Sequence, residues 1–347
     1  MVFRDLKRVK SAVARRARTG LQKLRARAWG RQRPVILMYH RIADEPFDPW
    51  GIAVAPDKFA DQLSWIRKHR TPLPLAEFAR LHRLGALPDD AVAVTFDDGY
   101  ACTAEVAAPL LDRFGVPATV FLPAGLIGRD QPFWWDELKH IVMSHSGAEL
   151  RALGKSWPIG EKQEKDAAWP SRLEQRTPRQ TGFYALWSRL QPLPGTAIEV
   201  AMAELRSQQP VVAMSKPERL MTVDEVRSMR SKAIDFGAHA MSHASLPGLP
   251  AAEKAREIRD SIDACEKLVD ARPVTFAYPF GDFDAECEAL VAETGFVCAC
   301  TVEPRAVDAT DGVFALPRLK VGNWAGRQLR QKLAEAALEA KSAAVGA

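Results

Sequence analysis

The sequence of 347 residues contains no long hydrophobic run and few cysteines. No stretch reaches the roughly 18 uninterrupted apolar residues that cross a bilayer, which excludes a transmembrane protein. The cysteines number only five, and their scattered spacing, without a CxxC pair, argues against a disulfide scaffold. The N-terminus also lacks the apolar core of a secretory signal. We therefore expect reduced thiols in a cytoplasmic protein.

Acidic residues are almost absent from one end of the chain. Residues 1–34 contain twelve lysines and arginines and a single acid, Asp5, which gives this segment a net charge of +11. The whole chain has a net charge of +5, which leaves −6 for residues 35–347. Because the body is mildly acidic, a nucleic-acid-binding role for the whole protein is disfavoured, and we expect no nucleic-acid partner.

The basic segment carries apolar residues every three or four positions, which places them on one face of a helix. These residues are Phe3, Leu6, Val9, Val13, Ala17, Leu21, Leu24 and Ala28. Such a helix can lie in a membrane interface with its cations beside anionic headgroups. We therefore predict that residues 1–33 form a basic amphipathic helix, which contacts an anionic membrane peripherally at the inner membrane face. The alternative is that the apolar stripe packs on the globular body.

Short apolar runs alternate with amphipathic segments from residue 34 onward. The runs are typical of strands buried on both faces and occupy residues 35–39, 92–96, 117–122, 234–238, 274–278 and 296–301. The amphipathic segments predict helices over residues 56–69, 102–114, 252–269 and 285–294. This alternation predicts an α/β fold with a parallel sheet, either open or closed into a barrel.

Residues 130–215 interrupt this alternation. The stretch is helix-prone, rich in charge and proline, and holds five of the nine tryptophans. We predict a helical insertion beside the working edge of the sheet, whose aromatic residues either stack on a sugar or hold the insertion in place. Residues 325–347 are rich in alanine and predict a C-terminal helix and tail.

Two adjacent carboxylates, Asp97 and Asp98, directly follow the apolar run at 92–96. Like charges raise each other's pKa unless a cation lies between them, so such a pair is costly without one. Gly99 allows the backbone to turn sharply, which lets both carboxylates face one point. At the C-terminal end of a buried strand, this pattern favours a metal site.

Two histidines, His239 and His243, follow the apolar run at 234–238 in a chain with only seven histidines. Histidines at this spacing reach one metal ion when the backbone is helical. Together with Asp98 they make a set of two imidazoles and one carboxylate. Such a set leaves coordination positions open for water and substrate, which suits catalysis better than a structural role.

The order TFDDG, HxxxH and FAYPFG resembles the polysaccharide deacetylase family, also called the NodB-homology domain. The resemblance covers about residues 35–129 and 216–322 of this sequence. It implies a deformed (β/α)7 barrel, which we assign to residues 34–129 and 216–324. It also implies hydrolysis of the N-acetyl group of an amino sugar.

The resemblance further implies a role for each motif residue. Asp97 would be the general base of the hydrolysis. Asp98, His239 and His243 would bind one divalent metal ion, usually zinc, with cobalt, nickel and manganese as alternatives.

The third motif and a C-terminal arginine complete the implied site. Pro279 forces Tyr278 into an extended conformation, and the resemblance implies that the Tyr278 N–H helps to hold the oxyanion. Arg318 matches a recurrent family position, where it either orients Asp97 or forms a surface salt bridge.

Two features depart from the family pattern. Ala240 stands where the family often has a serine or threonine that braces the loop. No histidine follows His243, although most members carry a general-acid histidine near the C-terminus. His40 resembles the acid of a permuted branch of the family, because the first and last strands of a barrel are neighbours. A helix-capping or core histidine is the alternative for His40.

The resemblance and the charge pattern together predict the substrate class. We expect an N-acetylated glycan or a lipid-linked sugar, made during synthesis of a cell-envelope polysaccharide. One alternative is a deformylase or de-N-acylase that acts on another small amide. A second is a non-catalytic carbohydrate- or membrane-binding protein on the same barrel, although such a protein has no need of Asp97. An aspartyl phosphatase is disfavoured, because its two aspartates would be separated by one residue.

Overall fold

The computed structural model describes residues 32–45, 47–167, 176–209, 218–229 and 233–345. The basic helix predicted for residues 1–33 therefore lies outside the described residues, except for its last two positions. None of the helices described is both long enough and apolar enough to cross a membrane.

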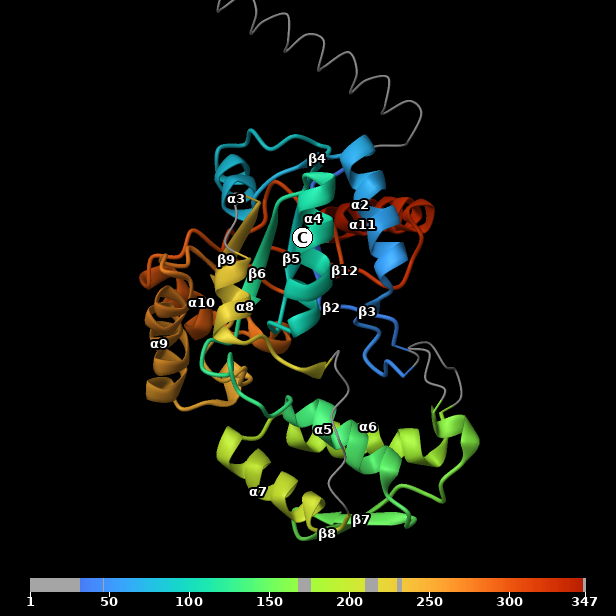
Figure 1. Cartoon of the computed structure of the whole chain (residues 1–347). Coiled ribbons are helices and arrows are strands. Elements are labelled where there is room, and N and C mark those ends of the chain that lie inside the picture. Colours follow the sequence, from blue (N-terminus) through green and yellow to red (C-terminus); the bar gives the residue numbers. More distant parts are fainter. Residues whose placement is uncertain (1–31, 46, 168–175, 210–217, 230–232, 346–347) are drawn as a thin grey trace, which may run out of the picture.

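A curled sheet of parallel strands forms the centre of the fold (Figure 1). The order of its strands is β11-β10-β9-β6-β5-β1-β12, and β4 pairs with the start of β5. Their bounds are β1 Val35–Tyr39, β4 Thr71–Pro72, β5 Ala91–Phe96, β6 Ala118–Leu122, β9 Ile234–Ala238, β10 Thr275–Ala277, β11 Cys298–Cys300 and β12 Leu319–Lys320. A bridge between Cys300 and Leu316 connects the edge strand β11 to the segment that leads into β12. The predicted α/β fold with a deformed seven-stranded barrel is confirmed.

The strands with continuous apolar sequences are buried along their whole length. Every residue of β1, β5 and β6 is buried, because β5 lies between β1 and β6 and helices cover the sheet. The covering helices are α2 Pro56–His69, α3 Leu75–Arg83, α4 Ala108–Phe114, α8 Val223–Ser228, α9 Ala251–Val269, α10 Ala285–Glu293 and α11 Gly326–Val345. A π-helix at Thr103–Ala107 precedes α4, and β2 Arg41–Ile42 pairs with β3 Ala53–Val54.

A second group of elements lies below the barrel in Figure 1, and its described side chains form a hydrophobic cluster of their own. Its elements are α5 Trp134–Ser144, β7 Glu149–Ala152, β8 Lys155–Pro158, a 3-10 helix at Glu164–Ala167, α6 Pro178–Leu190 and α7 Gly195–Arg206. The antiparallel hairpin β7–β8 was not expected from the sequence. Its two-residue turn, Leu153 and Gly154, has positive φ at both positions, as a type I′ hairpin turn requires.

The parallel strands bring the three motifs to one end of the barrel. Asp97 and Asp98 follow β5, His239 follows β9, and Tyr278 follows β10. Since parallel strands end at the same edge of a sheet, residues far apart in the sequence meet there.

Candidate active site

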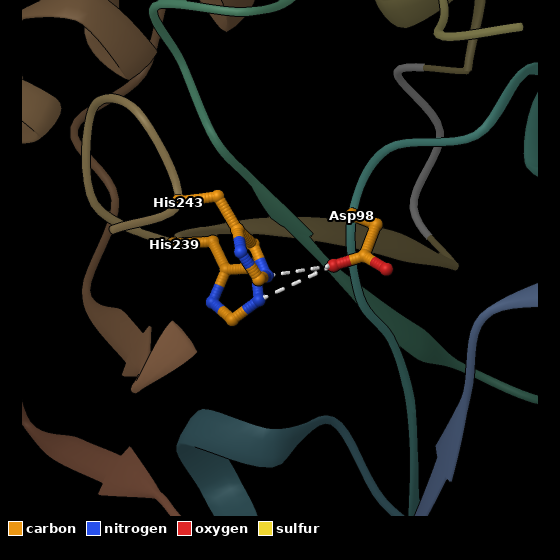
Figure 2. Close-up of side chains that lie close together, drawn as sticks. All are labelled: Asp98, His239 and His243. Atoms are coloured by element: carbon orange, nitrogen blue, oxygen red, sulfur yellow. Dashed lines mark ion pairs between the residues drawn. The ribbon is translucent and has the colours of Figure 1, made fainter. Parts of the chain in front are cut away.

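Three buried side chains, Asp98, His239 and His243, meet at this end of the barrel. Their ligand atoms all lie within 4.8 Å of one another. Oδ1 of Asp98 is 3.5 Å from Nε2 of His239 and 3.1 Å from Nε2 of His243. Figure 2 shows both imidazole rings turned toward this one carboxylate. The structure therefore brings together the three residues that the motifs single out as metal ligands.

The backbone around these residues differs from the expected helix. Residues 239–243 form no helix, and Ala240 and His243 have positive φ angles of 58° and 57°. Asp98 is likewise left-handed, with φ 73°. Non-glycine residues in this region are strained and cluster at functional sites. Left-handed turns, rather than a helical spacing, are what bring the two imidazoles to one carboxylate.

Glu257 of α9 supports the loop in which Ala240 replaces the family's serine or threonine. Its Oε2 accepts hydrogen bonds from the backbone N–H groups of Met241 and Ser242, both at 2.9 Å. Its Oε1 accepts a third from the hydroxyl of Ser242 at 2.7 Å. A glutamate from a neighbouring helix therefore braces the loop, and no sequence motif points to it.

The hydrogen bonds of the cluster fit a cation between its donors. Nδ1 of His239 donates to the carbonyl oxygen of Ala277 at 2.7 Å, so in the neutral ring Nε2 presents a lone pair to Asp98. Burial lowers the pKa of His243 and favours its neutral form. A lone pair that faces a carboxylate places two hydrogen-bond acceptors against each other, which is unfavourable. A metal ion between them removes this repulsion because it binds both groups. A backbone partner on the far nitrogen is also the usual companion of a metal-bound imidazole.

Asp97 is held by Arg318 in a buried two-point contact. Nη1 and Nη2 of Arg318 donate to Oδ1 and Oδ2 of Asp97, each at 2.7 Å. Nε of the arginine donates to the carbonyl of Thr301 at 2.8 Å, and its side chain is 0 % exposed. Burial would raise the pKa of Asp97, but the charge and hydrogen bonds of Arg318, together with the charges of His239 and His40, lower it below its usual value. This geometry fits the expectation that Arg318 orients Asp97. Because the arginine side chain is buried, the alternative of a surface salt bridge is excluded.

His40 follows β1 and lines the same cavity as Asp97, Asp98 and the two other histidines. Its Nδ1 is buried and has no hydrogen-bond partner within the part of the chain that the structure describes. Burial lowers the pKa of His40, and the charges of Asp98 and Asp97 oppose that shift. A strand at the front of the chain thus places a histidine in the cavity that holds the cluster, and its role as the general acid stays a prediction.

Tyr278 and Pro279 directly follow β10, and Tyr278 lines the same cavity as the cluster. The backbone N–H of Tyr278 donates to the carbonyl of Cys300 at 3.2 Å, and its hydroxyl donates to the carbonyl of Phe314 at 3.0 Å. The amide is thus paired with the neighbouring strand, and its expected role toward an oxyanion stays a prediction. Pro279 is buried and begins a short 3-10 turn, Pro279–Gly281, in which Phe280 has φ 58°. That turn places the Phe280 ring 4.5 Å from the ring of His243.

A cavity of about 450 Å³ surrounds the cluster, within the size range of small-ligand sites. Aromatic side chains line it from the barrel side and from the elements around the second hydrophobic cluster. They are Trp50, Trp135, Trp187, Tyr278 and Phe280. Trp50 lies against Trp187 with 4.8 Å between ring centroids, and Trp135 lies 4.9 Å from His243. Trp50 and Lys320, which also lines the cavity, carry no sequence signal and were missed.

A family model described as polysaccharide deacetylase matches residues 85–171 and 207–299, slightly more than half of the chain. The chain belongs to the polysaccharide deacetylase family. The unmatched stretch between the two segments contains all of α6 and α7. These two helices therefore lie outside the segments that the family model describes.

One relative of this chain is the poly-beta-1,6-N-acetyl-D-glucosamine N-deacetylase of Escherichia coli (strain K12), which is 26% identical over 161 residues. That match covers 38% of this chain and 24% of the relative, so the chain spans about a quarter of the relative's length. Two solved structures share the fold. Streptococcus pyogenes deacetylase PplD has a TM-score of 0.56 at 18% identity and covers 87% of this chain and 99% of its own. IcaB from Ammonifex degensii has a TM-score of 0.54 at 17% identity, with 87% and 97% covered.

Proposed function

We propose that this protein hydrolyses the N-acetyl amide of an amino sugar in a glycan with the help of one divalent metal ion. Zinc is the first candidate for this ion. The observation that carries the proposal is the meeting of Asp98, His239 and His243 in one cavity with an arginine-held Asp97. A non-catalytic glycan-binding protein would gain nothing from a buried carboxylate held at both oxygens by a buried guanidinium.

The ligand set fits the metal chemistry that this reaction uses. Two neutral imidazoles and one carboxylate suit zinc and leave positions open for water and substrate. When bound there, the ion would lower the pKa of water and polarise the acetyl carbonyl as a Lewis acid. Cobalt, nickel and manganese remain alternatives with the same donors.

The other residues of the cavity supply proton transfer and orientation. Asp97 takes a proton from the attacking water as general base, and Arg318 fixes the direction of its two oxygens. His40 gives a proton to the departing amine, which is too basic to leave as an anion. Burial lowers the pKa of His40, and the charges of Asp98 and Asp97 limit that shift by favouring the imidazolium form. The products are acetate and a free amino sugar.

The substrate that we propose is a polymer of N-acetylglucosamine. The Escherichia coli relative is named for its action on the β-1,6-linked polymer, and the aromatic walls of this cavity suit the apolar faces of sugar rings. A lipid-linked sugar is the second candidate, and a small formyl or acyl amide is the third. Acetate or formate release, measured over a panel of these substrates, would separate the three.

Removal of the metal is expected to abolish acetate release. His239→Gln deletes one ligand, so the purified variant should lose bound metal and activity together, as should the natural protein after treatment with a chelator. Metal content is measured by mass spectrometry, and acetate is measured with N-acetylglucosamine oligosaccharides.

The matched control for this experiment is His40→Gln. The same change in the same cavity leaves the three ligands in place, so this variant should keep its metal while losing activity. Full acetate release by chelated protein, or by a metal-free His239→Gln protein, would contradict the metal site.

We further propose that the protein is cytoplasmic and binds the inner membrane face through residues 1–33. The support is the sequence pattern alone: twelve basic residues around an apolar stripe. Each cation near an anionic surface contributes about 1 kcal/mol.

A truncation that removes residues 1–31 is expected to abolish sedimentation with vesicles that contain 30% phosphatidylglycerol. This truncation keeps Arg33, which pairs with Asp308 at 2.5 Å. Phosphatidylcholine vesicles serve as the control. Equal sedimentation of the full and shortened chains would remove the membrane proposal.

A further inference from the structure

A second cavity, of about 760 Å³, lies against the candidate active site. It shares Trp135, His243 and Phe280 with the catalytic cavity. The wall between the two cavities is therefore made of the same three side chains, whose ring centroids lie 4.5 to 5.5 Å apart. Nothing in the proposed reaction uses this second space.

One side of the second cavity comes from the insertion. Gln191, Leu193, Gly195, Ile198, Glu199 and Arg206 line it, and all six lie in the stretch that the family model does not match. The opposite side comes from the barrel loops, among them Ser242 and Ser245. The cavity thus lies between α7, with the turn that precedes it, and the loops at the end of the barrel.

The walls of the second cavity offer aromatic faces and hydrogen-bonding groups without excess charge. Trp134 lines it beside Trp135, with 5.5 Å between ring centroids. Arg206 donates to both Glu137 and Glu199 at 2.6 Å, which ties the arginine to two carboxylates. Among the described lining residues, the two arginines balance the two glutamates.

The side chains of Gln191 and Ser245 add polar groups to this wall. Both donate to Oδ2 of Asp282 at 2.8 Å, which holds their polar ends in place. A balanced wall of this kind suits a neutral, hydroxyl-rich ligand better than a phosphate. Aromatic side chains that alternate with such groups are what a sugar ring requires.

We propose that the second cavity is a subsite for the sugar units next to the one that loses its acetyl group. This inference rests on the proposed function. A glycan with its reacting unit beside Asp97 would cross the ring of Phe280 and continue between α7 and the barrel loops. The insertion would then select polymeric over short substrates, because only a longer chain reaches both cavities.

Gly195→Trp tests this subsite with little risk to the fold. Gly195 begins α7 and lines the cavity, and a Cβ built on it meets no atom within 4 Å. An indole at this position would occupy the space proposed for the glycan. The ratio of kcat/KM for a hexasaccharide to that for a disaccharide should fall by at least about tenfold, which corresponds to about 1.4 kcal/mol.

The matched control is Ala203→Trp, which places the same side chain on an exposed position of α7 outside the cavity. It should keep the chain-length ratio of the natural protein. A natural protein that releases acetate equally well from every chain length would overturn the subsite and leave the proposed function standing.

Calorimetry distinguishes the failure of the subsite from the failure of the proposed function. If the metal-loaded natural protein releases no acetate from any oligosaccharide, the proposed function fails, and binding of the hexasaccharide decides the subsite alone. Binding that is weaker in Gly195→Trp than in Ala203→Trp supports the subsite. Equal or absent binding in the natural protein and both variants overturns it.

Discussion

Asp97→Asn is expected to slow acetate release by at least about 100-fold, the usual contribution of a general base. The amide that replaces the carboxylate cannot accept the proton of the attacking water. Asp97 lies outside the set of three ligands, so the variant should keep its bound metal. The measurement is the initial rate of acetate release from an N-acetylglucosamine oligosaccharide, with metal content determined on the same sample.

Loss of folded protein must be separated from loss of the base. The substitution leaves the guanidinium of Arg318 buried without its charge partner, so a lower melting temperature is expected as well. Rates are therefore compared well below the melting temperature of the variant, where circular dichroism shows it folded. A folded, metal-loaded variant that works within tenfold of the natural rate would contradict the role of Asp97.

The buried strands could be predicted from the sequence because a strand that is buried on both faces is a continuous run of apolar residues. The runs at 35–39 and 92–96 correspond to β1 and β5, with every residue buried. The strands of the hairpin β7–β8 contain no such continuous apolar run. Only one of its faces is buried, and its turn is Leu153–Gly154 rather than the Asn-Gly that usually marks such a hairpin.

The members of the candidate site could be predicted, but their geometry could not. Motif order placed Asp98, His239 and His243 at strand ends, and parallel strands then bring them together. The left-handed backbone of Ala240 and the bracing role of Glu257 depend on tertiary contacts that no local periodicity records. The sheet pairing of the Tyr278 amide is a long-range contact of the same kind, and the oxyanion role of this amide stays a prediction.

Buried charged residues hold the insertion in a fixed position relative to the candidate active site. Arg41, 1 % exposed, pairs with Asp136 of α5 at 2.5 Å and lies over the ring of Tyr100. The hydroxyl of Tyr100 donates to Asp136 at 3.0 Å and accepts from the indole N–H of Trp135 at 3.3 Å. This network joins the segment after β1, the loop after the two catalytic-motif aspartates, and the helix that presents Trp135 to His243. Together with the hydrophobic cluster to which Tyr100 and Trp135 belong, it holds one wall of both cavities.

Arg318→Met is expected to cost about 3–5 kcal/mol of folding free energy, because it leaves the carboxylate of Asp97 buried without a partner. It should also remove most activity, since the carboxylate loses the two bonds that aim it. Arg318→Lys is the conservative control. It keeps the positive charge but cannot reproduce the paired 2.7 Å contacts, so it should recover more stability than activity.

The double variant Arg318→Met with Asp97→Asn separates charge balance from catalysis. With both charges removed, neither group is buried without its partner, so the melting temperature should rise above that of either single variant. Acetate release should stay as low as in Asp97→Asn, because no base is restored. Chemical unfolding and acetate release, measured on all four proteins, complete the cycle. Strictly additive losses of stability would mean that the two groups do not form a coupled pair, and the assignment of Arg318 as the residue that positions the base would then be wrong.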